Sequence, residues 1–80
     1  MAIDLEKVRC FEYWFFAEVD QSQKDALAQT LVGILSNGGY STDISEEDHP
    51  HTGVTFYYTS QRKLTDKIER EIRKYCRMVT

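Results

Sequence analysis

The chain has 80 residues, a formal net charge of −3 and one proline, and 41% of its residues are hydrophobic. This length predicts one domain over residues 1–80, near the lower size limit for a protein that folds alone. The hydrophobic content excludes an intrinsically disordered chain, and no apolar stretch is long enough to predict a membrane-spanning helix.

The first predicted element is a strand from about Lys7 to Val19 that is apolar on both faces. One side carries Phe11, Tyr13, Phe15, Ala17 and Val19, and the other carries Cys10, Glu12, Trp14, Phe16 and Glu18. A half-buried strand needs only one apolar face. The second face therefore requires cover, either from this chain or from another molecule.

A helix is predicted next, with Asp20 as its N-cap and Gln23 as the capping-box partner. It continues to about Asn37, where Gly38 and Gly39 end it, since a glycine suits the left-handed position after a helix. Its apolar stripe consists of Leu27, Ala28, Leu31, Ile34 and Leu35.

Two more strands are predicted at Tyr40–Ser45 and Val54–Thr59, joined by the polar loop Glu46–Gly53. Ser60 then caps a final helix over Gln61–Met78. The apolar stripe of this helix consists of Leu64, Ile68, Ile72, Tyr75 and Val79. Its opposite side is expected to carry Arg62, Lys63, Lys67, Arg70, Arg73, Lys74 and Arg77.

This β-α-β-β-α order predicts an α+β fold. A right-handed crossover between the first two strands leaves a slot for the third strand. The expected sheet is three-stranded and antiparallel, in the order 1-3-2, with both helices on one face. It resembles a ferredoxin-like fold truncated before its fourth strand, a resemblance that implies a fold and no function. The outer edge of the first strand is then unpaired, so residues 1–6, a second copy or a partner strand should cover it.

The outer face of this sheet is the first candidate site. Trp14, Phe16 and Tyr57 are the expected anchors, because large aromatic side chains dominate interface energies. Glu12, Glu18 and Asp43 are the expected polar rim. We expect a non-catalytic protein-binding module that acts by occlusion or bridging, as an inhibitor, adaptor or immunity-type factor does. We expect a homodimer, in which a second copy covers this face, and the alternative occupant of the face is a different protein.

A nucleic-acid-binding regulator is the alternative. Residues 61–80 hold seven basic and three acidic side chains, and the cations expected to contact phosphates are Lys63, Lys67, Arg70, Lys74 and Arg77. Intrahelical ion pairs on a solvated face explain the same pattern. Aromatic side chains on the first and third strands also resemble the RNA-recognition module, but Thr55–Thr59 lacks the glycine and arginine of that module's third strand.

An enzyme whose site is assembled at a dimer interface is the third reading. A deep pocket lined by Cys76, His49 or His51 would support this reading. Cys76 lies in basic surroundings that could lower its thiol pKa, but nothing in the sequence places either histidine near it. The sequence around His49 and His51 is the only metal-like cluster, and it lacks a further ligand at a rigid spacing. We expect no cofactor and no metal. The acidic N-terminus has no signal-peptide pattern, which predicts a cytoplasmic protein whose Cys10 and Cys76 are free thiols.

Overall fold

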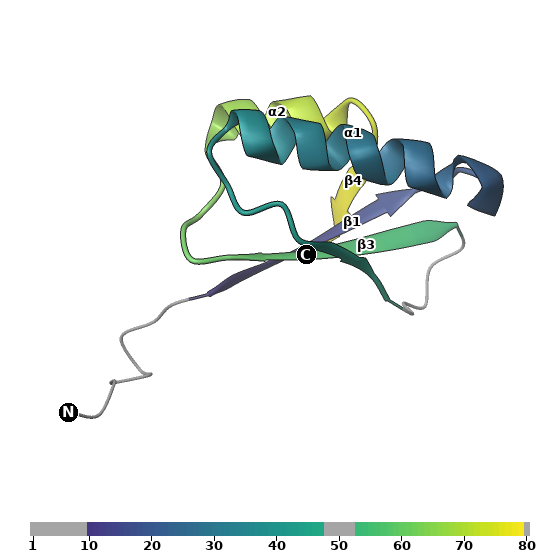
Figure 1. Ribbon diagram of the computed structural model, residues 1–80, viewed down its shortest axis with the longest axis horizontal. Helices are drawn as coiled ribbons and strands as arrows, with labels where there is room; N and C mark the ends of the chain where they lie inside the picture. The colour runs from purple at the N-terminus through teal and green to yellow at the C-terminus, as the bar shows by residue number, and fades with distance from the viewer. Residues whose placement is uncertain (1–9, 48–52, 80) are drawn as a thin grey trace.

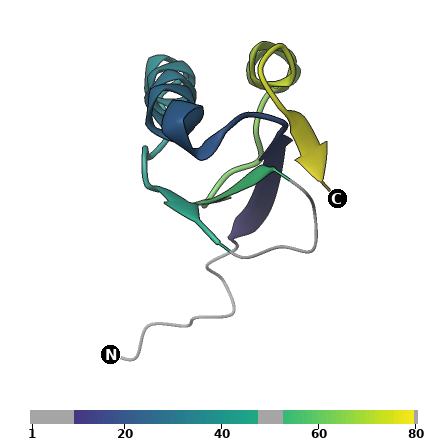
Figure 2. The same cartoon turned by 90° about the vertical axis from the view of Figure 1, so that its right-hand side faces the viewer.

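The computed structural model of the chain describes residues 10–47 and 53–79. Two helices pack side by side on one face of a four-stranded antiparallel sheet (Figures 1 and 2). The elements in chain order are β1 (Phe11–Ala17), the 3-10 turn η2 (Gln21–Gln23), α1 (Lys24–Asn37), β2 (Ile44–Glu46), β3 (Val54–Ser60), α2 (Asp66–Arg73) and β4 (Arg77–Val79). The sheet order is β2-β3-β1-β4, so β1 is an interior strand.

Strand β1 is hydrogen-bonded along both edges. It pairs with β3 over its whole length, and it pairs with β4 from Trp14, opposite Val79, to Phe16, opposite Arg77. The predicted three-stranded, truncated sheet is therefore wrong. The predicted unpaired edge is wrong between Trp14 and Phe16, because the end of the chain returns to this edge as β4.

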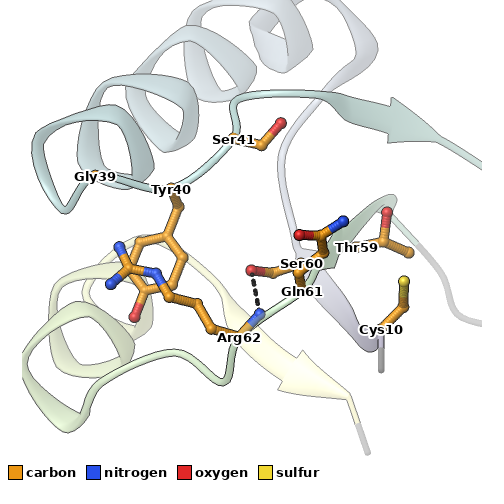
Figure 3. Close-up of a pocket in the computed structure, with 8 residues that line it drawn as sticks. All are labelled: Cys10, Gly39, Tyr40, Ser41, Thr59, Ser60, Gln61 and Arg62. Atoms are coloured by element: carbon orange, nitrogen blue, oxygen red, sulfur yellow. Dashed lines mark hydrogen bonds between the residues drawn. The ribbon is translucent and has the colours of Figure 1, made fainter. Parts of the chain in front are cut away.

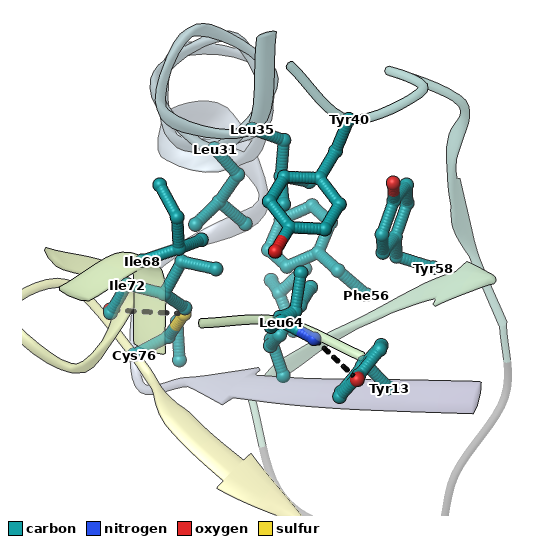
Figure 4. Close-up of a cluster of buried hydrophobic side chains, with 13 residues drawn as sticks. Tyr13, Leu31, Leu35, Tyr40, Phe56, Tyr58, Leu64, Ile68, Ile72 and Cys76 are labelled. Carbon is teal, nitrogen blue, oxygen red and sulfur yellow. Dashed lines mark hydrogen bonds between the residues drawn. The ribbon is translucent and has the colours of Figure 1, made fainter. Parts of the chain in front are cut away.

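The core lies between the helices and one face of the sheet (Figure 4). The side of β1 and β3 that faces the helices is the one that period two predicts, with Phe15 and Tyr58 each 0% exposed. Leu31 and Leu35 of α1 and Ile72 of α2 are buried against them. The alternation of the strands therefore fixes which aromatic rings form the core.

Helix α1 ends as predicted and begins differently. Gly38 is its C-cap, and Gly39 follows with a φ of 78°, the left-handed conformation that glycine adopts without strain. The Arg62 guanidinium donates a hydrogen bond to the Gly38 carbonyl at 2.9 Å, so it satisfies one acceptor at this end. At the start, the Asp20 side chain makes no capping hydrogen bond, and η2 precedes the helix, so the capping-box prediction is wrong.

Tyr40 does not belong to the second strand, which is shorter than predicted. The Tyr40 ring is buried, and its hydroxyl accepts a hydrogen bond from the Thr65 backbone N–H at 3.0 Å. The same hydroxyl donates to the Lys63 carbonyl at 3.1 Å. Tyr40 therefore connects the end of α1 to the segment that enters α2, and β2 begins only at Ile44.

The last helix is less than half as long as the predicted Gln61–Met78. Thr65 ends the preceding loop and caps α2, since its hydroxyl accepts a hydrogen bond from the Ile68 backbone N–H at 3.4 Å. After α2, the Cys76 N–H donates to the Ile72 carbonyl, and the chain then extends into β4. Pairing with β1 ends the helix here, although the apolar spacing would allow it to continue. No helix among residues 10–47 and 53–79 is long and apolar enough to cross a bilayer.

Two glycines should respond in opposite directions to substitution by alanine. Gly33 lies within α1, and a Cβ atom there meets nothing within 4 Å. Gly33→Ala should raise the free energy of unfolding by about 0.5–1 kcal/mol, because alanine loses less backbone entropy in a helix. Gly53 has a φ of 100°, and a Cβ atom there would lie 2.7 Å from the Ala17 carbonyl oxygen. Gly53→Ala should lower the free energy by about 1–3 kcal/mol in urea unfolding. Equal changes in the free energy of unfolding in the two variants would contradict this prediction.

Two buried tyrosines should differ in how much their hydroxyl groups contribute to stability. The Tyr13 hydroxyl accepts a hydrogen bond from the Leu64 backbone N–H at 2.7 Å, whereas the Tyr58 hydroxyl has no partner among the described residues. Tyr13→Phe should lower the free energy of unfolding by about 1–2 kcal/mol, because it leaves a buried N–H unsatisfied. Tyr58→Phe should be neutral or stabilising. A larger loss in Tyr58→Phe than in Tyr13→Phe would contradict this prediction.

Candidate functional site

The candidate site is the face of the sheet opposite the helices, called the outer face below. The strand register places Ser45, Tyr57, Trp14 and Val79 in one row across β2, β3, β1 and β4. Both α1 and α2 lie on the other side of the sheet (Figure 2). The outer face therefore presents a row with two aromatic side chains at its centre and no helix of the described chain above it.

Trp14 and Tyr57 form the centre of this row. Their ring centroids are 4.7 Å apart and the rings are tilted by 45°, and both side chains are partly buried. The Tyr57 hydroxyl donates a hydrogen bond to the Glu12 carboxylate at 3.1 Å. The pKa of Tyr57 is raised, first by desolvation and then by its hydrogen bond to Glu12 and the negative charges of Glu12 and Glu47. The pair is thus held in place beside carboxylates.

Phe16 faces the same side but is not the exposed anchor that the sequence predicts. Only 3% of this residue is exposed. The Arg77 guanidinium of β4 lies over the Phe16 ring, 4.9 Å from its centroid, and Gly53 lies close to the ring edge. Arg77 also forms an ion pair of 3.6 Å with Glu18. The predicted position of Arg77 in the last helix is wrong, because this residue belongs to β4 and lies on the outer face.

The three predicted rim residues have different positions. Glu12 lies on the outer face opposite Thr59, and Glu18 follows β1 next to Arg77. Asp43 is exposed and precedes β2, so the strand ladder does not place it beside the aromatic pair. Ser45 is the β2 residue beside Tyr57, and it is not among the predicted site residues.

The five predicted nucleic-acid contacts do not share one helix face. Lys63 precedes α2, and Arg77 lies in β4 on the outer face. Lys67, Arg70 and Lys74 do gather, with Glu71, around a surface hollow of about 500 Å³. Lys74 forms an ion pair of 3.1 Å with Glu71. The expected continuous basic face is therefore wrong, and a smaller cluster that includes one carboxylate replaces it.

A larger hollow, of about 630 Å³, lies where the start of β1, the loop after α1 and the end of β3 meet (Figure 3). Arg62, the one cation among the described residues that line it, lies over the Tyr40 ring, 4.0 Å from its centroid, and also caps α1. The exposed thiol of Cys10 and several hydroxyl groups complete the lining. Among the described residues that line this hollow, none is a histidine, an aspartate or a glutamate.

Cys76 is not an activated nucleophile. Burial raises the pKa of its thiol to about 11, which corrects the expectation that basic surroundings lower it. The thiol donates a hydrogen bond to the Ile72 carbonyl at 3.6 Å. Cys10 and Cys76 are both free. His49 and His51 lie outside the described residues, and within the described ranges no three potential ligands cluster as a metal site would require.

Comparisons of the chain with protein-family models, with curated proteins and with solved structures found no match.

The raised pKa of Cys76 predicts how stability changes at high pH. The folded state favours the neutral thiol, so this contribution is complete below about pH 9 and is lost as the pH rises towards about 11. Cys76→Ala should therefore have a free energy of unfolding that falls less steeply than wild type over this range. Cys10→Ala is the matched control, because that residue is exposed, and it should keep the wild-type slope. Equal slopes in all three proteins would contradict the assignment to Cys76.

Proposed function

We propose that this protein is a non-catalytic protein-binding module that docks a partner on its outer face and acts by occlusion or bridging. The observation that carries the proposal is the Trp14–Tyr57 pair, which lies on the two central strands with no helix of the described chain above it. Tryptophan and tyrosine are enriched among the residues that dominate interface energies.

The geometry of the pair supports binding because the rings are already ordered. The tilted ring contact between Trp14 and Tyr57 and the hydrogen bond from Tyr57 to Glu12 restrict the side chains before a partner arrives. A preorganised surface loses less side-chain entropy on association. Val79 extends the apolar row onto β4. Together these residues form an apolar row across β3, β1 and β4 that an extended protein surface could cover.

The edge of β1 offers a second point of attachment. Within the described residues, the ladder to β4 covers Trp14–Phe16 and does not include Phe11–Tyr13. A partner strand could continue the sheet at this shorter edge while it contacts the adjacent outer face. The element order, β-α-β-β-α-β, supports a ferredoxin-like fold, which hosts many functions and does not choose among them. The free thiols favour a cytoplasmic location.

Nucleic-acid binding is the second candidate, and the cluster of Lys67, Arg70 and Lys74 is the observation that favours it. These cations could contact a phosphate backbone. Their cluster includes Glu71, which pairs with Lys74 and reduces the local positive charge. The carboxylates beside Tyr57 would also repel phosphates from the outer face. Protein binding therefore has the stronger support.

The test compares three immobilised proteins in nuclease-treated extract of the cells that produce this chain. Proteins retained by wild type should be lost with the double variant Trp14→Ala/Tyr57→Ala, since two anchors of about 1 kcal/mol each weaken binding roughly thirtyfold. The variant Arg70→Glu/Lys74→Glu should retain them. Mass spectrometry of the bound fraction gives the measurement.

Circular dichroism and urea unfolding confirm that the variants are folded. Light scattering on the same proteins distinguishes a homodimer from a foreign partner, because self-association through the outer face would appear as a mass that Trp14→Ala/Tyr57→Ala halves. Retention of the same proteins by wild type and by this double variant would refute the proposal. Nucleic acid bound in untreated extract and lost with Arg70→Glu/Lys74→Glu would favour the second candidate.

A further inference from the structure

Within residues 10–47 and 53–79, the outer face carries carboxylates around its aromatic pair that form no ion pair. Glu12 accepts the hydrogen bond of the Tyr57 hydroxyl, and Glu47, directly after β2, is close enough for its charge to act on the same hydroxyl. The ion pairs among the described residues are Lys24–Glu46, Glu71–Lys74 and Glu18–Arg77. Neither Glu12 nor Glu47 takes part in one of them.

The other end of the same face shows how this sheet accommodates a cation. The Arg77 guanidinium lies 4.9 Å from the centroid of the Phe16 ring and 3.6 Å from a carboxylate oxygen of Glu18. At this end the chain itself supplies the cation, the aromatic ring below it and the carboxylate beside it. Trp14 and Tyr57, with Glu12 and Glu47, combine the same two chemical groups one row further along the strands.

We propose that the partner is a basic protein segment that places an arginine or lysine side chain over the Trp14–Tyr57 pair, between Glu12 and Glu47. This inference rests on the proposed function and specifies the partner. Indole rings attract cations more strongly than other aromatic rings, and arginine is the commoner partner. The carboxylates add charge complementarity, which favours cationic segments and repels anionic ones.

The experiment uses the single tryptophan of the chain as its probe, because Trp14 lies at the proposed contact. Three peptides of equal length are titrated into the whole protein: alternating Arg and Thr, alternating Gln and Thr, and alternating Glu and Thr. The Arg–Thr peptide should change the Trp14 emission in a saturable manner. The other two should leave the emission unchanged over the same concentrations.

Two variants that remove carboxylates from different layers of the molecule test the placement of the cation. Glu12→Gln/Glu47→Gln retains Trp14 and should weaken binding of the Arg–Thr peptide by about tenfold, as two partly exposed charge contacts would. Asp25→Asn removes an exposed negative charge from α1 on the helix layer. It should leave the affinity unchanged.

Equal binding of the Arg–Thr and Gln–Thr peptides would overturn the inference, as would equal losses in Glu12→Gln/Glu47→Gln and Asp25→Asn. An Arg–Thr peptide that causes no saturable change in the Trp14 emission would also overturn it. Suppose that the peptides give one of these results, but wild type retains extract proteins that Trp14→Ala/Tyr57→Ala does not retain. The proposed function then stands, and only the basic character of the partner is wrong. If both experiments fail, the proposed function is wrong as well.

Discussion

The structure depends on β1 being buried on both faces and paired along both edges. Phe15 is fully buried in the core and its neighbour Phe16 is nearly so on the outer face, although the two side chains point in opposite directions. Hydrophobic burial on one face attaches the helices to the sheet, and pairing with β3 and β4 satisfies the backbone hydrogen bonds on either side. The other elements are arranged around this strand, including the aromatic pair of the candidate site.

Elements with a clear local pattern could be predicted from the sequence. The alternation in β1 and β3 identified the side that faces the helices, and the two glycines after Asn37 marked the end of α1. The last helix could not be bounded in this way, because Val79 continues the 3.6-residue spacing of Ile68 and Ile72. Tertiary pairing decides this case: the open edge of β1 makes strand pairing the better conformation for Arg77–Val79.

The candidate site likewise combines features that follow from local sequence pattern with features that depend on tertiary pairing. The facing of Trp14 and Tyr57 could be predicted from strand parity and from the pairing of the first and third strands. The burial of Phe16 could not, because it depends on Arg77, and the position of Arg77 depends on β4. The charge of the outer face could be predicted only in part. Sequence periodicity assigns Glu18 to the sheet and Arg77 to a helix, whereas the two side chains form an ion pair on this face.

The pairing of β1 with β4 joins the first and last strands of the described chain. Such long-range pairing gives a high contact order and slows folding. During synthesis β1 emerges before β4. The edge of β1 that β4 covers, on a strand with apolar side chains on both faces, therefore stays unpaired until β4 has also emerged. Chaperone capture or self-aggregation during translation would therefore compete with folding at the edge that β4 finally covers.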